Sequence, residues 1–184
     1  MKKLIICLIL LFVTFGCSSR PIPFELGDTV NPPKGCRDFR SRGGHCILNY
    51  KEEQELFETF LDVKYRFVYV SDYDRYLERE YWTFPSEMVD RRGNYLTDIV
   101  EGDCEDFAIL MRDILKSKGI PSRLVICLTE NGSAHVVLDV YNGYILDMRY
   151  DNIMNREDLP YEWLMISGYE PGDMWHEIKP IGVS

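Results

Sequence analysis

A cysteine, a histidine and an aspartate occur in this chain in a setting that suits thiol-dependent acyl transfer. Cys104 lies in the segment Gly-Asp-Cys-Glu-Asp at residues 102–106, His135 lies in a strand-like run, and Asp147 lies in the next such run. In such chemistry a thiolate attacks a carbonyl carbon, an imidazole carries the proton, and a carboxylate fixes the tautomer of the imidazole. We therefore take these three residues as candidate nucleophile, base and orienting group.

The segment after the cysteine has the pattern of a buried helix. Apolar residues recur at helical spacing until Gly119 and Pro121 stop the run, which predicts a helix over residues 104–118. Asp103 would be its N-cap and Cys104 would lie in the first turn. Unpaired N–H groups and the positive end of the helix dipole favour a thiolate there, and the same N–H groups can hold an oxyanion.

The remaining elements predict a single α+β domain. Residues 52–67 have helical periodicity, and three strand-like runs follow the cysteine helix at residues 122–129, 134–141 and 144–149. Beyond them the sequence suggests an irregular tail whose aromatic residues cover a sheet edge. The expected fold has the helix that carries the cysteine packed on a small antiparallel sheet that carries the histidine and the aspartate, with helices on one side of the sheet.

The turn between the last two runs decides whether Asp147 can reach His135. A two-residue turn at Asn142-Gly143 would put Asp147 on the opposite face of the sheet. A three-residue loop over residues 141–143, with Gly143 in the left-handed region, pairs Val140 with Tyr144 and puts Asp147 on the face of His135. We predict the second register. Asp139, further along the strand of His135 and on the same face, is the fallback orienting group.

Each of these residues also has an ordinary structural interpretation. A cysteine near a helix start is usually structural, a histidine in a strand is usually a packed or surface residue, and acidic residues there can serve only to match the helix dipole. The order of the three residues and their placement on the expected elements together favour catalysis.

The N-terminus has the pattern of an export signal. A basic pair at residues 2–3 precedes an apolar run over residues 4–15 that is short for a membrane span, and Gly16 precedes Cys17. The segment resembles a lipoprotein signal peptide over residues 1–16, with Cys17 as the lipidated residue and an outer-membrane sorting type. An ordinary signal peptide with an incidental cysteine is the alternative. We expect a tether and N-terminal arm over residues 17–50, a catalytic domain over residues 51–184, and a location on the periplasmic face of the outer membrane.

Composition limits the partners of the exported chain. Without residues 1–16 the chain has 168 residues, and its remaining 19 lysines and arginines stand against 30 acidic residues, a formal charge of −11. This length suffices for one domain with a sizeable core. The acidic balance argues against nucleic acid and anionic lipid head groups as partners.

The other cysteines have separate explanations. Cys36 and Cys46 flank a basic, glycine-rich loop, and in an oxidising compartment a disulfide between them is expected. A metal site that uses His45 is the alternative, although its spacing matches no common zinc pattern. Cys127 lies in an apolar run and is expected to be an inert core thiol. Cys104 is thereby left as the free cysteine in a polar, charged setting.

Several segments together resemble one protein family. The segments are residues 102–108 (Gly-Asp-Cys-Glu-Asp-Phe-Ala), 81–87 (Tyr-Trp-Thr-Phe-Pro-Ser-Glu), 118–121 (Lys-Gly-Ile-Pro), 134–138 (Ala-His-Val-Val-Leu) and 145–147 (Ile-Leu-Asp). They are similar to motifs of the bacterial transglutaminase-like cysteine proteinases, whose best-known members are LapG-like periplasmic proteases.

This resemblance implies a papain-like, transglutaminase-type core with Cys104, His135 and Asp147 as the catalytic triad. It also implies limited proteolysis of large surface adhesins and a dependence on calcium, with Asp103 and Glu105 as ligands. Two carboxylates cannot by themselves complete the roughly six to eight oxygens that calcium takes. No organic cofactor is expected.

The resulting hypothesis is an exported cysteine endopeptidase that clips a protein or peptide substrate at the cell surface. Acyl transfer to an amine, or hydrolysis of peptide or peptidoglycan amides, is the alternative within enzymes. The alternative outside enzymes is a binding lipoprotein on the same scaffold.

Overall fold

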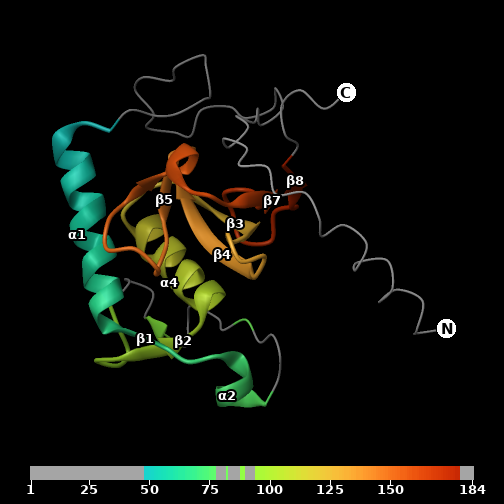
Figure 1. The fold of residues 1–184 in the computed structure, drawn as a ribbon. Coiled ribbons are helices and arrows are strands. Elements are labelled where there is room, and N and C mark those ends of the chain that lie inside the picture. The colour runs from blue at the N-terminus through green and yellow to red at the C-terminus, as the bar shows by residue number, and fades with distance from the viewer. Residues whose placement is uncertain (1–47, 78–81, 83–87, 90–93, 179–184) are drawn as a thin grey trace, which may run out of the picture.

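The computed structural model describes residues 48–77, 82, 88–89 and 94–178 (Figure 1). The expected signal peptide over residues 1–16, the lipidation at Cys17 and the disulfide between Cys36 and Cys46 lie outside the described residues. So does the segment 81–87 apart from Trp82. In the part of the chain that is described, no helix has the length and apolar character needed to cross a membrane.

The domain combines helices with two sheets. The elements before the large sheet are α1 (Tyr50–Arg66), β1 (Phe67–Tyr69), α2 (Asp72–Tyr76), β2 (Val100–Gly102) and α4 (Cys104–Ser117). The later elements are β3 (Ser122–Leu128), β4 (Ala134–Val140), β5 (Tyr144–Leu146), β6 (Met154–Asn155), the 3-10 turn η1 (Arg156–Asp158), β7 (Glu162–Ile166) and β8 (His176–Glu177). The six-stranded sheet is antiparallel with the order β6-β5-β4-β3-β7-β8, whereas β1 and β2 form a separate parallel pair. The predicted α+β class is confirmed.

Helix α1 begins two residues earlier than the sequence pattern predicted because of its capping box. The Asn49 side chain accepts hydrogen bonds from the N–H groups of Lys51 and Glu52, and the Glu52 side chain accepts one from the N–H of Asn49. This reciprocal arrangement satisfies N–H groups that a helix start otherwise leaves unpaired. The helix then buries Leu56 and Phe60 against the core.

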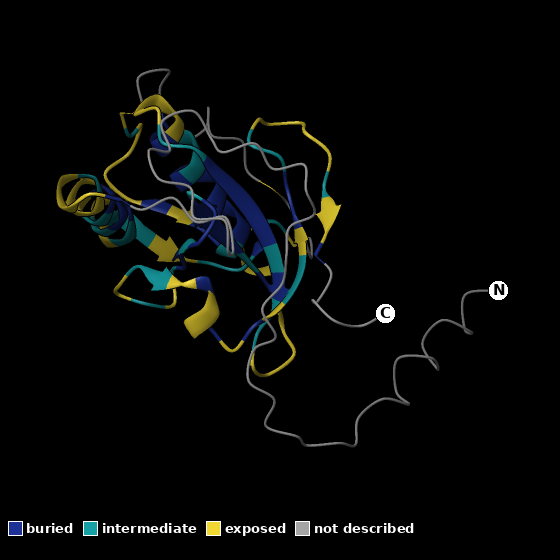
Figure 2. Cartoon of the chain, turned by 90° about the horizontal axis from the view of Figure 1, so that it is seen from above, coloured by how far each residue is buried: buried dark blue, intermediate teal, exposed yellow. Residues whose placement is uncertain are grey.

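Helices α1 and α4 cover the same face of the large sheet. Both contribute to one cluster of buried apolar side chains, which also includes Leu124 of β3 and Leu138 of β4. Phe107 of α4 packs edge-on against Phe60 of α1 and Phe67 of β1, with ring centroids 6.1 and 5.2 Å apart. These contacts fix the first turns of α4 relative to β1. Figure 2 shows the buried centre and the exposed outer side of α1.

The opposite face of the sheet has its own core. Because side chains alternate along a strand, Val137 of β4 points away from α4, as do His135 and Asp139 on the same strand. Val137 packs there with Cys127, Ile145 and other buried side chains of the second apolar cluster. Cys127 is fully buried, so its predicted place in the core is confirmed.

The hairpin between β4 and β5 has the predicted register and a different turn conformation. Val140 pairs with Tyr144, as expected for a three-residue loop. The left-handed residues are Tyr141 (φ 53°) and Asn142 (φ 62°), so the prediction of a left-handed Gly143 was wrong. Asn142 tolerates this conformation better than most side chains. Its side-chain oxygen also accepts hydrogen bonds from Arg123 (2.6 Å) and Arg156 (3.3 Å), which hold the turn.

The C-terminal segment is more regular than the sequence indicated. Instead of an irregular tail, it supplies β7, which pairs with β3, and β8, which pairs with β7. Short strands that are apolar on both faces give no clear period, and a shift of register between Ile126 and Cys127 further hides the pairing. Strands β7 and β8 therefore extend the sheet beyond the three strands that the sequence predicted.

Candidate active site

The start of α4 is set by a close contact that requires glycine. A Cβ atom on Gly102 would lie 2.4 Å from the Asp106 side-chain oxygen, so only glycine fits at the end of β2. Asp103 then takes an extended conformation as the N-cap residue, and its carbonyl oxygen accepts the N–H of Phe107 at 3.1 Å. Its side chain makes no capping hydrogen bond, in contrast to the sequence prediction. The carboxylate faces an acidic cluster instead.

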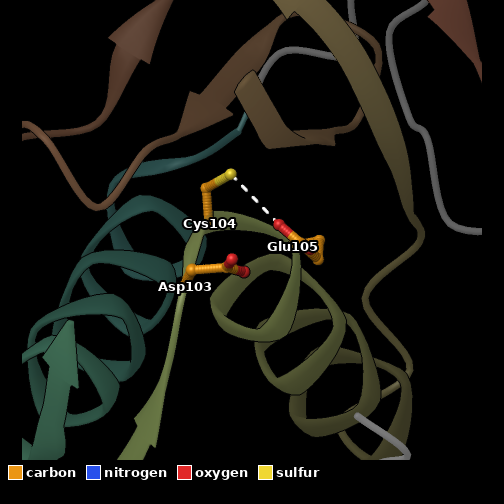
Figure 3. Close-up of side chains that lie close together, drawn as sticks. All are labelled: Asp103, Cys104 and Glu105. Atoms are coloured by element: carbon orange, nitrogen blue, oxygen red, sulfur yellow. Dashed lines mark hydrogen bonds between the residues drawn. The ribbon is translucent and has the colours of Figure 1, made fainter. Parts of the chain in front are cut away.

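Cys104 lies in the first turn of α4, partly exposed, with its thiol directed away from the helix (Figure 3). The thiol donates to the Glu105 side-chain oxygen at 3.2 Å. Burial raises the pKa of Cys104 well above its ordinary value, and the charges of Glu105 and Asp103 add to the rise, although the N–H of Val136 donates to the sulfur and opposes it. The expected lowering of the thiol pKa by the helix start is therefore outweighed in this arrangement.

His135 and Asp147 meet as the register predicted. His135 Nε2 lies 2.9 Å from Asp147 Oδ1, and both side chains are buried. Burial opposes ionisation of Asp147, but hydrogen bonds from His135, Tyr161 and the backbone of Arg149 hold its pKa below the ordinary value. With Nε2–H donated to this carboxylate, the tautomer leaves His135 Nδ1 as the basic ring nitrogen.

The backbone of β4 connects the thiol to the histidine. The N–H that donates to the Cys104 sulfur belongs to Val136, the residue after His135. The start of α4 thus contacts the start of β4 through Cys104 and Val136, the residue next to His135. Asp139, the fallback orienting group, is held elsewhere, because it forms ion pairs with Arg123 at 2.9 Å and Arg156 at 2.7 Å.

Two residues that hold Asp147 were not predicted from the sequence. Tyr161 donates its hydroxyl to Asp147 Oδ2 at 2.6 Å, and Arg149 donates its backbone N–H to Asp147 Oδ1 at 2.9 Å. Tyr161 precedes β7 and is buried against the histidine, whereas the sequence suggested an aromatic residue that covers a sheet edge. Only the pairing of β7 with β3 brings it there, and no local signal in the sequence indicates that pairing.

Carboxylates gather on the other side of the cysteine. Ligand atoms of Asp103, Cys104 and Glu105 all lie within 4.8 Å of one another, and so do those of Asp72, Asp103 and Asp106. The sequence named only Asp103 and Glu105 as candidate metal ligands. Asp72 belongs to the short helix α2, and the parallel pairing of β1 with β2 brings it next to α4.

Protein groups compensate the carboxylates of Asp103 and Glu105 poorly in the part of the chain that the structure describes. Among the described residues, Asp103 Oδ1 and Glu105 Oε1 are buried without a hydrogen-bond partner, and neither side chain has an ion pair. Burial, together with a hydrogen bond to Asp103 and the charge of Asp103, raises the pKa of Glu105 to about 8. Hard oxygen ligands with unsatisfied negative charge fit a divalent cation such as calcium.

Comparison with known proteins agrees with this arrangement. The family model of the bacterial transglutaminase-like cysteine proteinases matches residues 28–182. Calcium-bound LapG of Legionella pneumophila shares the fold, with 22% identity, a TM-score of 0.53 and 67% of each chain covered. A second structure of that protein has 25% identity and a TM-score of 0.51, with 64% of this chain and 65% of that chain covered. An EGTA-treated form has 22% identity and a TM-score of 0.54, with 71% and 69% covered.

No curated protein sequence matches the chain. The family match nevertheless extends over most of the chain, and it includes the cysteine helix and every strand of the large sheet. The chain belongs to the bacterial transglutaminase-like cysteine proteinases and is a cysteine peptidase.

Proposed function

We propose that the chain is a cysteine endopeptidase in which Cys104 is the nucleophile, His135 the general base and Asp147 the orienting group. The observation that carries this proposal is the 2.9 Å hydrogen bond between His135 and Asp147, next to the strand residue whose N–H contacts the Cys104 sulfur. The three residues occupy the roles that a thiol triad requires.

The reaction follows from these positions. His135 Nδ1 takes the thiol proton of Cys104, and the sulfur attacks the carbonyl carbon of a peptide bond. The negative oxygen that forms is stabilised by the backbone N–H of Cys104 at the helix start. When the C–N bond breaks, His135 returns the proton to the leaving amine and a thioester remains. Water then attacks the thioester with His135 again as the base, which releases the acid and restores the thiol.

We also propose that calcium binds the cluster formed by Asp103 and Glu105 together with Asp72 and Asp106. The crowding of buried carboxylates supports this proposal, as does the calcium-bound state of LapG from Legionella pneumophila. A bound cation would offset the carboxylate charges that raise the pKa of Cys104. The residues on either side of the nucleophile would then control its ionisation.

The sequence and the family resemblance also support a proposal for the location and the substrate. We propose that Cys17 carries a lipid anchor and that the domain acts on the periplasmic face of the outer membrane. A surface protein of the adhesin type is the proposed substrate, because the family resemblance points to such proteins.

The test compares Cys104→Ala, His135→Ala and a control, Cys127→Ala, which removes the other free thiol of the described residues. Each protein receives iodoacetamide or 4-nitrophenyl acetate in the presence of calcium. We expect modification of Cys104 and a stoichiometric burst of nitrophenolate in the wild type and the control, no burst with Cys104→Ala, and a loss of at least tenfold with His135→Ala. A Cys104 that reacts like a free thiol, at a rate independent of His135, would contradict the proposal.

A further inference from the structure

Both oxygens of the Asp147 carboxylate accept hydrogen bonds, and the histidine is the donor to only one of them. Oδ1 accepts hydrogen bonds from His135 Nε2 and from the N–H of Arg149, both at 2.9 Å. Oδ2 accepts one from the Tyr161 hydroxyl at 2.6 Å. We infer that Tyr161 is a positioning residue for Asp147, and that an ion pair between Arg149 and Glu130 in turn holds Tyr161. This inference rests on the proposed role of Asp147 in catalysis.

Loss of the Tyr161 hydroxyl would leave Asp147 incompletely satisfied. Asp147 is 1% exposed, so water cannot readily replace the donor to Oδ2. A buried carboxylate oxygen without a hydrogen-bond donor raises the free energy of the folded state. Rotation of the carboxylate toward another donor would lower that free energy. Such a rotation would weaken the bond from Oδ1 to His135. The hydroxyl therefore acts on the imidazole through the aspartate.

The ring of Tyr161 is fixed independently of its hydroxyl. It packs edge-on against the His135 ring at 6.1 Å and against the Trp163 ring at 5.5 Å. The side chain is 6% exposed. Burial and the hydrogen bond to Asp147 raise the pKa of Tyr161 far above its ordinary value, so the phenol stays protonated and donates. The Tyr161 hydroxyl is therefore a hydrogen-bond donor in a fixed position.

Arg149 connects this hydroxyl to the turn before β4. Its guanidinium donates to the Tyr161 oxygen at 3.1 Å and to both carboxylate oxygens of Glu130, at 2.5 and 3.2 Å. The guanidinium also lies over the Tyr161 ring, 5.6 Å from its centroid. Glu130 lies between β3 and β4, shortly before His135. The pair thus joins the turn that precedes the histidine to the residue two positions after the aspartate.

The first variant for the test is Tyr161→Phe, which keeps the ring and removes only the hydroxyl. The matched control is Tyr95→Phe, because Tyr95 also donates to a carboxylate, Asp62 at 3.2 Å, on the surface near α1. We expect Tyr161→Phe to lower the acylation rate by 4-nitrophenyl acetate roughly tenfold, and the control to leave it unchanged.

The second readout is the NMR resonance of the His135 Nε2 proton, which does not require turnover. A proton held by Asp147 gives a downfield signal that exchanges slowly with water. In Tyr161→Phe this signal should move upfield and exchange at least tenfold faster. An unchanged signal would overturn the inference even if the activity fell, because the loss would then not pass through His135. If Tyr161→Phe alters the signal although the wild type shows no burst, the positioning role is supported while the proposed function fails.

A third variant, Arg149→Lys, keeps the charge and the backbone N–H but loses the two-pronged contact with Glu130. We expect a decrease of roughly threefold in the acylation rate, and no further decrease when it is combined with Tyr161→Phe, because Arg149 acts through the hydroxyl. Additive losses would overturn the part assigned to Arg149. This variant also tests the network if Tyr161→Phe fails to fold.

Discussion

Two regions of this domain that contain buried carboxylates differ in one respect. On the sheet, Asp139 is fully buried and is ion-paired with two arginines. At the start of α4, Asp103 and Glu105 are buried with side-chain oxygens that have no partner among the described residues. The first region has cations of its own, whereas neither Asp103 nor Glu105 has an ion pair among the described residues.

The pairs on the sheet connect elements that are far apart in the sequence. Arg123 lies on β3, Asp139 on β4 and Arg156 in η1, and Asn142 accepts from both arginines at the β4–β5 turn. Buried ion pairs with additional hydrogen bonds fix a structure and do little else. Asp139 is thereby removed from consideration as a catalytic residue, although it shares a face with His135.

The difference between the regions separates structure from function. A carboxylate that the fold compensates itself has no capacity left for a ligand. A group of carboxylates in which one residue raises the pKa of its neighbour, as Asp103 does for Glu105, has that capacity. Substitutions of carboxylates in the two regions should therefore have opposite effects on the stability of the metal-free protein.

The largest effect is expected for Asp139→Asn. The substitution leaves two buried guanidinium groups with one fewer countercharge, and loss of one partner of a buried pair typically lowers the free energy of unfolding by about 3–5 kcal/mol. Urea denaturation at neutral pH measures the loss. The companion variant Asp103→Asn, measured without calcium, should be neutral or stabilising because it relieves repulsion. A decrease below about 1 kcal/mol for Asp139→Asn would remove the distinction between the two regions.

The second effect is the response to calcium. If the cluster at α4 takes the ion, calcium at a hundred times its dissociation constant should raise the free energy of unfolding by about 2.7 kcal/mol. Thermal denaturation with calcium and with chelator measures the change. Asp103→Asn and Glu105→Gln should abolish it, whereas Glu101→Gln, an exposed carboxylate on the adjacent strand β2, should leave it intact. An equal response in all three variants would place the ion elsewhere.

The third effect is the pH dependence of the metal-free protein. Burial and the neighbouring Asp103 raise the pKa of Glu105 from 4.5 to about 8 in the folded state. Between these values the folded state binds more protons than the unfolded state, so stability falls as pH rises through this range. We expect a progressive loss of stability between pH 5 and pH 8, which Glu105→Gln removes. Metal-free protein that gains stability between pH 5 and pH 8, in parallel with Glu105→Gln, would show that Glu105 ionises normally.

The parts of the site that the sequence predicts depend on local signals. The helix over residues 104–117 follows from apolar spacing, and the pairing of Val140 with Tyr144 follows from the length of the loop between them. Strand β5 ends at Leu146, before the predicted end at residue 149, and this register continued by one residue puts Asp147 on the face of His135. The left-handed Asn142 was missed because the side-chain bonds that favour it come from Arg123 and Arg156, outside the turn.

The missed parts depend on contacts between distant segments. Asp72 reaches the acidic cluster through the pairing of β1 with β2, and Tyr161 reaches Asp147 through the pairing of β7 with β3. Neither pairing has a periodic signal in its short strands. The pKa of Cys104 was misjudged for a related reason: the helix start acts locally, whereas burial and the orientation of Glu105 are tertiary effects.

The smallest effect is expected for an ion pair that is as short as those of Asp139 but exposed. Lys116 and Glu170 lie 2.6 Å apart, with side chains 49% and 67% exposed. Because water and salt screen such a pair, Glu170→Gln should change the free energy of unfolding by less than about 1 kcal/mol, and 1 M salt should remove the change. Urea denaturation at low and high salt gives both numbers. If this variant lost as much stability as Asp139→Asn, the distance between the charges would decide the strength of these pairs. A small loss would show that burial decides it. Because the carboxylates at α4 are buried and uncompensated, they are the ones that we expect to bind an ion.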